Sequence, residues 1–86
     1  MQKSVSNPDY LRFVALLREA RKNAGLSQVE LAERLHEKQS LVSKVERGER
    51  RLDIIELRAF CLAIGITLTE FCTQLERELK GDTAPR

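Results

Sequence analysis

The 86-residue chain has few aromatic residues and few residues that interrupt helices. It has no Trp, one Tyr and three Phe, and only two Pro and four Gly. Sandwiches and barrels need more aromatic and β-branched residues, so this composition favours an all-α fold. A chain of this length has too little interior for two hydrophobic cores, and one compact domain is expected.

Cysteine and histidine are also scarce, which argues against a metal site. Cys61 and Cys72 stand in apolar surroundings, with no CxxC pair and no His at ligand spacing, and are interpreted as thiols of a reducing compartment. His36 is the single histidine, and the residues around it support neither a metal site nor catalysis. No cofactor is expected.

Long apolar runs and catalytic constellations are both lacking. No run approaches the roughly 18 residues that span a bilayer, and the first ten residues lack the apolar stretch of a signal peptide. The sequence therefore predicts a cytoplasmic protein without a membrane partner. It shows no Ser/His/Asp, Cys/His or paired-carboxylate arrangement and no glycine-rich phosphate loop, so we do not expect an enzyme.

The charge is small in total but uneven along the chain. The formal net charge is +2. Residues 1–51 hold eleven Lys and Arg against seven Asp and Glu, whereas residues 52–86 hold four against six. The basic part is the candidate for a phosphate-binding surface, although an ordinary solvated surface would explain the charge equally well.

Capping signals, and for the third helix the spacing of Val42 and Val45 before Gly48, divide the chain into five predicted helices. Asn7-Pro8-Asp9 is a start signal, and a cap followed three residues later by Glu occurs at Ser27, Asp53 and Thr67. The expected helices are 8–24, 28–35, 39–47, 54–64 and 68–79. They form one domain over residues 8–79, between flexible ends at 1–7 and 80–86. His36 is the best candidate for a positive φ in the turn after the second helix.

The second and third predicted helices form a helix-turn-helix pattern. They are short, a turn of a few residues joins them, and Ala32 is small where another helix must approach closely. We expect Leu31, Ala32, Val42 and Val45 to be buried where the two helices meet.

The residues of this pattern resemble a known family. Leu26 to Leu35 and Gln39 to Gly48 are similar to the phage Cro and repressor-type (XRE) regulators, and the similarity continues through Leu57, Ile64, Gly65, Ile66 and Leu68. It covers about residues 13–75. The resemblance implies a five-helix, lambda-repressor-like domain that binds double-stranded DNA through the major groove.

The resemblance also implies roles for individual residues. The expected base contacts on the recognition helix are Gln39, Ser40, Ser43 and Lys44. The expected phosphate contacts are Gln28, Lys38, Arg50 and Arg51. The sequence departs from the family at two points: His36-Glu37 replaces the common glycine and apolar residue of the turn, and Lys38 replaces a small hydroxyl cap.

A single recognition helix reads few base pairs, so we expect a homodimer on a pseudo-palindromic operator. The candidate interface consists of apolar positions on the last two helices: Ile55, Leu62, Leu68, Cys72, Leu75 and Leu79. The expected function is a transcriptional regulator, more specifically a repressor. Two alternatives remain at this point: an antitoxin or other protein-interaction module on the same fold, and a restriction-modification controller protein.

Overall fold

The computed structural model describes residues 7–79, which form five α-helices and contain no β-strand. The helices are α1 (Pro8–Asn23), α2 (Gln28–Leu35), α3 (Gln39–Glu46), α4 (Ile54–Ile64) and α5 (Leu68–Leu79). The all-α, five-helix prediction is confirmed, and only α1 and α3 end one residue earlier than expected. The flexible ends expected for 1–7 and 80–86 lie outside the described residues except for Asn7.

Four of the five helices described, α1, α2, α4 and α5, begin where the capping signals place them. The Oδ1 atom of Asn7 accepts hydrogen bonds from the backbone N–H groups of Asp9 and Tyr10, at 2.9 and 3.1 Å. Both reciprocal bonds of the capping box form at Ser27 with Glu30, Asp53 with Glu56, and Thr67 with Glu70. The backbone N–H groups that the first turn leaves free are thereby satisfied by local side chains.

The turn between α2 and α3 forms without a glycine. His36 adopts the left-handed conformation, with φ 57° and ψ 41°, as the sequence predicted. The backbone N–H of Glu37 then donates to the carbonyl of Ala32 at 2.9 Å, which closes the end of α2. The turn therefore closes α2 without the glycine that is common in the family at this point.

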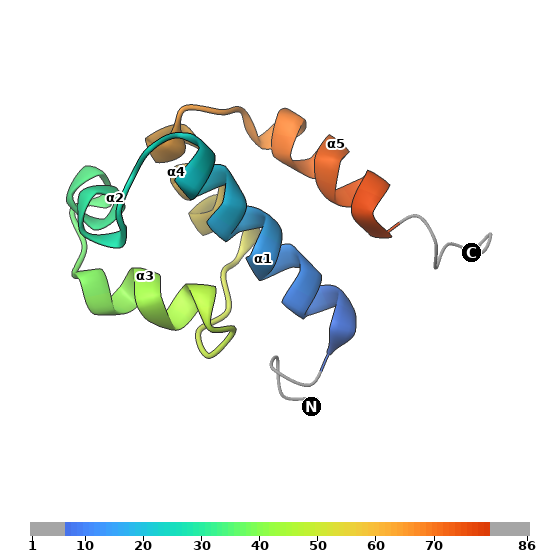
Figure 1. The fold of residues 1–86 in the computed structure, drawn as a ribbon, viewed down its shortest axis with the longest axis horizontal. Coiled ribbons are helices and arrows are strands. Elements are labelled where there is room, and N and C mark those ends of the chain that lie inside the picture. The colour runs from blue at the N-terminus through green and yellow to red at the C-terminus, as the bar shows by residue number, and fades with distance from the viewer. Residues whose placement is uncertain (1–6, 80–86) are drawn as a thin grey trace.

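α1 lies at the centre of the arrangement, with α2 and α3 on one side of it and α5 on the other (Figure 1). α1 packs against α3 and α5, α2 packs against α3 and α4, and α4 packs against α5. The core residues with the least exposure are Leu17, Leu31, Val42, Val45 and Cys61.

Burial of the helix-turn-helix contact is confirmed. Leu31, Val42 and Val45 are fully buried, and Ala32 is 2% exposed. Because α3 is packed through Val42 and Val45 against α1 and α2, its opposite face is held outward.

Candidate nucleic-acid interface

The outward face of α3 is polar along its length. Gln39, Ser40 and Lys44 are exposed and Ser43 is half-buried, all on the side of the helix away from Val42 and Val45. An α-helix with its side chains is about 10–12 Å wide, which matches the roughly 12 Å width of the major groove. The four residues expected to contact bases thus share one side of a helix whose width is close to that of the groove.

The N-terminus of α3 has no side-chain cap. Lys38 occupies the N-cap position, and its side chain makes no capping hydrogen bond. Free backbone N–H groups and an exposed ammonium group therefore meet at one helix end, where both favour an anion. Lys38, Ser40, Lys44 and Arg50 also border one shallow hollow beside α3, together with Leu41, Glu37 and Glu49.

Arg50 and Arg51 lie in the loop between α3 and α4, where each has an intramolecular partner. The Arg50 guanidinium pairs with the Glu56 carboxylate, with 2.9 Å between Nη2 and Oε2. The Arg51 guanidinium carbon lies 4.5 Å from the centre of the Tyr10 ring. Both arginines therefore help to hold this loop against the helices, in addition to any role at a phosphate.

The ion pair between Arg50 and Glu56 also involves the start of α4. The hydrogen bond from Arg50, together with the one from the backbone N–H of Asp53, lowers the pKa of Glu56 to about 2. The same carboxylate thus serves as the partner of an arginine near α3 and as half of the α4 capping box.

Arg47 is a further cation of this surface that the sequence reasoning missed. Its guanidinium pairs with Glu49, at 3.0 Å from Nε to Oε2, and also donates to Ser43 Oγ. The signal was present, because Arg47 follows Ser43 by four residues and so lies beside it on the helix. Since the Ser43 oxygen is already an acceptor, its hydroxyl hydrogen is left to donate elsewhere.

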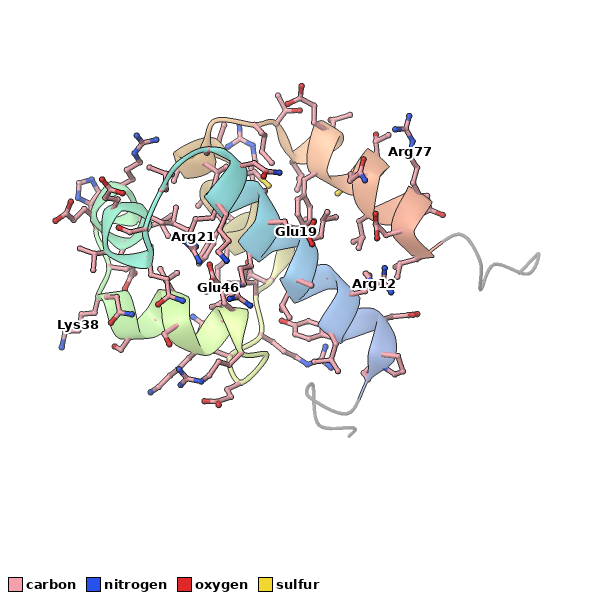
Figure 2. All side chains as sticks on the ribbon, viewed as in Figure 1. Arg12, Glu19, Arg21, Lys38, Glu46 and Arg77 are labelled. Atoms are coloured by element: carbon pink, nitrogen blue, oxygen red, sulfur yellow. The ribbon has the colours of Figure 1, made fainter. Side chains whose placement is uncertain are left out.

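A buried ion pair lies behind this surface and joins α1 to α3. Arg21 Nε is 2.6 Å from Glu46 Oε2, Arg21 Nη2 is 3.0 Å from Glu46 Oε1, and Arg21 Nη1 donates to the Leu26 carbonyl at 2.7 Å. The two side chains are only 8% and 4% exposed. Figure 2 shows Arg21 and Glu46 pointing toward each other between the two helices.

The sequence reasoning did not predict this pair, although each residue interrupts an apolar stripe. Arg21 follows the buried Leu17 by four residues, and Glu46 follows the buried Val42 by four residues. A charged residue on the buried stripe of each of two helices is a signal for a buried ion pair, because a buried charge needs a partner.

Gln28 connects the ion pair to the recognition helix. Gln28 Nε2 donates to Glu46 Oε1 at 3.0 Å, and Gln39 Nε2 donates to Gln28 Oε1 at 2.6 Å. The structure therefore brings together one residue expected at a phosphate and one expected at a base.

The candidate dimer residues differ widely in exposure. Ile55 and Leu62 are 71% and 54% exposed, and Cys72 is exposed as well. Leu68, Leu75 and Leu79 are half-buried, and Leu68 and Leu75 also pack against the core. The outer face of α4 is thus the most exposed apolar part of the surface expected at the interface.

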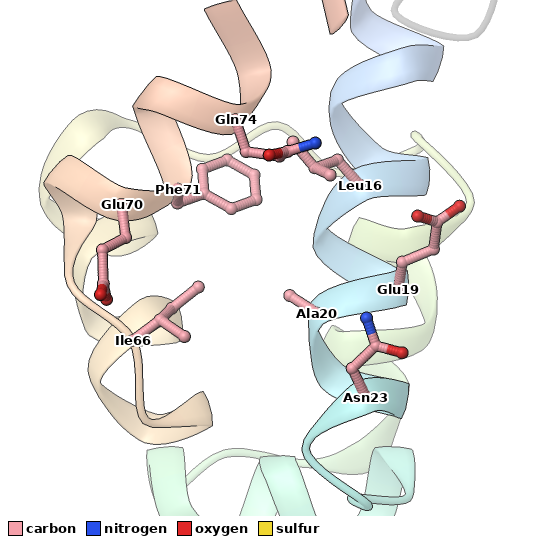
Figure 3. A pocket seen from close by; sticks show the side chains of 8 residues that line it. All are labelled: Leu16, Glu19, Ala20, Asn23, Ile66, Glu70, Phe71 and Gln74. Atoms are coloured by element: carbon pink, nitrogen blue, oxygen red, sulfur yellow. The ribbon is translucent and has the colours of Figure 1, made fainter. Parts of the chain in front are cut away.

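A second hollow lies between α1 and α5, away from the recognition helix (Figure 3). It has a volume of about 290 Å³ and is lined by Leu16, Glu19, Ala20, Asn23, Ile66, Glu70, Phe71 and Gln74. Its ionisable lining residues are carboxylates, which would repel a phosphate. Within residues 7–79 no cluster of His, Cys, Asp and Glu is suited to hold a metal ion. None of the helices described is long and apolar enough to cross a membrane.

Comparison with known proteins agrees with this geometry. The helix-turn-helix family model (HTH_3) matches residues 17–71, which is more than half of the chain. The chain is 46% identical to an XRE-family like protein from Pseudomonas syringae pv. tomato str. DC3000, whose solved structure superimposes with a TM-score of 0.79. The match covers 88% of this chain and 93% of that one. No curated protein matches the sequence.

The protein belongs to the helix-turn-helix family, and its fold and exposed recognition helix are those of a DNA-binding protein. Within that family it is an XRE-type transcriptional regulator.

Proposed function

We propose that the protein represses transcription by binding a specific pseudo-palindromic DNA site as a homodimer. The observation that carries the proposal is the outward polar face of α3, which is fixed from behind by the packing of Val42 and Val45. A helix held this rigidly presents its side chains to base edges at little further cost in conformational entropy. Occupation of a promoter is sufficient for repression and needs no surface beyond the one that binds DNA.

The charges and hydrogen-bonding groups support two sets of residues, one that contacts bases and one that contacts phosphates. We propose that Gln39, Ser40, Ser43 and Lys44 contact base edges, because they share the face of α3 opposite the buried Val42 and Val45. Gln28, Lys38, Arg50 and Arg51 flank this face and are proposed to position the helix by contacting phosphates. For Arg50 this requires the guanidinium to donate to the phosphate and to the Glu56 carboxylate at the same time.

Selection of binding sites from random duplex DNA, followed by titration of single-base variants, tests the proposed function. We expect a pseudo-palindrome with half-site centres about 34 Å apart, one helical turn of DNA. Gln39→Ala should cost about 1–3 kcal/mol on the preferred site and much less on other sequences. Arg51→Gln should weaken binding to all sequences and lower the salt slope by about one. Selection of no common sequence by the wild-type protein would reject the proposed function.

We propose that the dimer forms through the outer face of α4 and the adjoining edge of α5. Ile55 and Leu62 lie two helical turns apart on α4, so their exposed side chains form a stripe that a second copy can cover. Dimerisation would double the number of base contacts.

Charge insertion at an exposed interface residue separates dimerisation from folding. Ile55→Glu should give a folded monomer that binds the full site far more weakly, because the new carboxylate would be buried only in the dimer. Leu11→Glu is the matched control, since Leu11 is 41% exposed and lies outside the proposed interface. Sedimentation that shows the wild-type protein as a monomer, both free and on DNA, would exclude the dimer.

A further inference from the structure

We propose that Tyr10, on the first turn of α1, is a positioning residue for DNA binding, because its ring holds the Arg51 guanidinium ready for a phosphate. The inference rests on the proposed function, in which Arg51 contacts the DNA backbone. It extends the determinants of DNA binding beyond the two helices of the helix-turn-helix to the start of α1.

The contact between the two side chains is a cation–π interaction. The guanidinium carbon of Arg51 lies 4.5 Å from the centre of the Tyr10 ring. A guanidinium within about 6 Å of a ring centre is attracted by the negative face of the ring. Arg51 is exposed, and a long exposed side chain otherwise samples many rotamers. Tyr10 therefore restricts the conformations of a cation on the surface of the protein.

The uncharged partner leaves Arg51 available to an anion. Among residues 7–79 no carboxylate pairs with the Arg51 guanidinium. The neighbouring Arg50, in contrast, pairs with Glu56 at 2.9 Å, so a phosphate must compete with a carboxylate there. The face of an aromatic ring accepts no charge and occupies none of the five N–H donors in the plane of the guanidinium. Of the two arginines in the loop, Arg51 is thus the better prepared for a phosphate.

The Tyr10 ring is itself held by the hydrophobic core. Tyr10 packs against Phe13, with 5.1 Å between the ring centres. Phe13 packs edge-on against Phe71, with 5.8 Å between the ring centres. Phe71 is 2% exposed and belongs to the core cluster. A row of three rings therefore connects the core to the loop that follows α3.

Restriction of Arg51 in the free protein favours binding, because less order has to be imposed when the phosphate is bound. Immobilising a long side chain at an interface costs free energy, and a side chain already held in its bound conformation avoids most of that cost. Phosphate contacts are independent of sequence. We therefore expect loss of the ring to weaken binding to every duplex by about two- to ten-fold.

The test measures the affinity of Tyr10→Leu and Tyr10→Phe for the selected site and for an unrelated duplex. Leucine keeps apolar bulk but has no ring, so Tyr10→Leu should weaken binding to both duplexes by about two- to ten-fold. Phenylalanine keeps the ring face and should bind both duplexes within about two-fold of the wild-type protein. Its loss of the Tyr10 hydroxyl, which is buried without a hydrogen-bond partner among the residues described, should not lower stability. Unchanged affinity in Tyr10→Leu would overturn the proposal.

A double-mutant cycle separates positioning from a general structural effect. If Tyr10 acts through Arg51, Tyr10→Leu should change affinity by less than about two-fold in the Arg51→Gln background. Val14→Ala is the matched control, because Val14 is 4% exposed on the same helix and its truncation lowers stability without removing the ring. It should keep full affinity well below its Tm. An undiminished effect of Tyr10→Leu without Arg51, or an equal loss of affinity in Val14→Ala, would overturn the proposal.

A measurement on the wild-type protein applies even if Tyr10→Leu does not fold. The ring current of Tyr10 should shift the NMR signals of the Arg51 side chain away from those of another exposed arginine, such as Arg77, and the shift should persist in the complex with DNA. Loss of the shift on binding would mean that the phosphate draws Arg51 off the ring, which would refute positioning. If Arg51→Gln binds DNA as tightly as the wild-type protein, the proposed phosphate contact fails together with the inference. If Arg51→Gln weakens binding and Tyr10→Leu does not, the inference alone fails.

Discussion

Ala32 is a small residue in the buried contact between α2 and α3, where added volume should lower stability. Its side chain is 2% exposed and belongs to the same core cluster as Leu31, Val42 and Val45, which are all fully buried. Ala32→Leu adds three carbons at this contact. Insertion of extra methyl or methylene groups into a packed core typically costs about 1–3 kcal/mol. For a domain of this size each kcal/mol shifts Tm by about 4–8 °C, so we expect a decrease of roughly 4–24 °C.

Thermal unfolding followed by circular dichroism measures this effect, and Ala15→Leu is the matched control. Ala15 is exposed on α1, so the same added carbons project into water and should change stability by less than about 0.5 kcal/mol. Because α3 must move to accommodate the larger residue, Ala32→Leu should also weaken binding to the selected DNA site. An Ala32→Leu variant that melts like the wild-type protein would refute the tight contact that holds α3 in place.

Three further predictions follow from the helix ends and the thiols. Lys38→Ser supplies the missing cap of α3 and should raise stability by about 0.5–2 kcal/mol, while a reduced salt slope in DNA titration reports the lost cation. The pKa of Glu56 is lowered from 4.5 to about 2, so the stability that its ionised carboxylate contributes is fully present above about pH 4.5 and is lost toward pH 2. The Tm advantage of the wild-type protein over Glu56→Gln should therefore shrink as the pH falls across that range. Burial raises the pKa of Cys61 to about 11, so a thiol reagent at neutral pH should modify the exposed Cys72 first, with mass spectrometry as the readout.

The ends of the helices were predictable because their causes are local. Each capping box lies within four consecutive residues, and the left-handed turn after α2 depends on a single residue, His36. The two small differences, at the ends of α1 and α3, occur where the cap residue itself keeps a helical φ and ψ, as at Ala24 and Arg47. Such ends have no sharp boundary, and a position error of one residue is expected there.

The surface of α3 was predictable for a related reason. The spacing of Val42 and Val45 defines which side is buried, and the polar residues on the other side follow from helical periodicity. The partners of those polar residues were not predictable in this way. The Glu56 partner of Arg50 and the Tyr10 partner of Arg51 belong to other parts of the chain, so only the packed structure brings them together.

The hydrogen bonds that connect Arg21, Glu46, Gln28 and Gln39 show why the finer chemistry of the site needs the structure. The four side chains come from three helices, and no two adjacent members are closer than eleven residues in the sequence. The sequence reasoning treated Gln28 and Gln39 as independent DNA contacts. The structure instead joins both glutamines to the buried ion pair through hydrogen bonds. Periodicity and composition cannot indicate such contacts, because they act along one element, whereas these hydrogen bonds form only when three helices pack together.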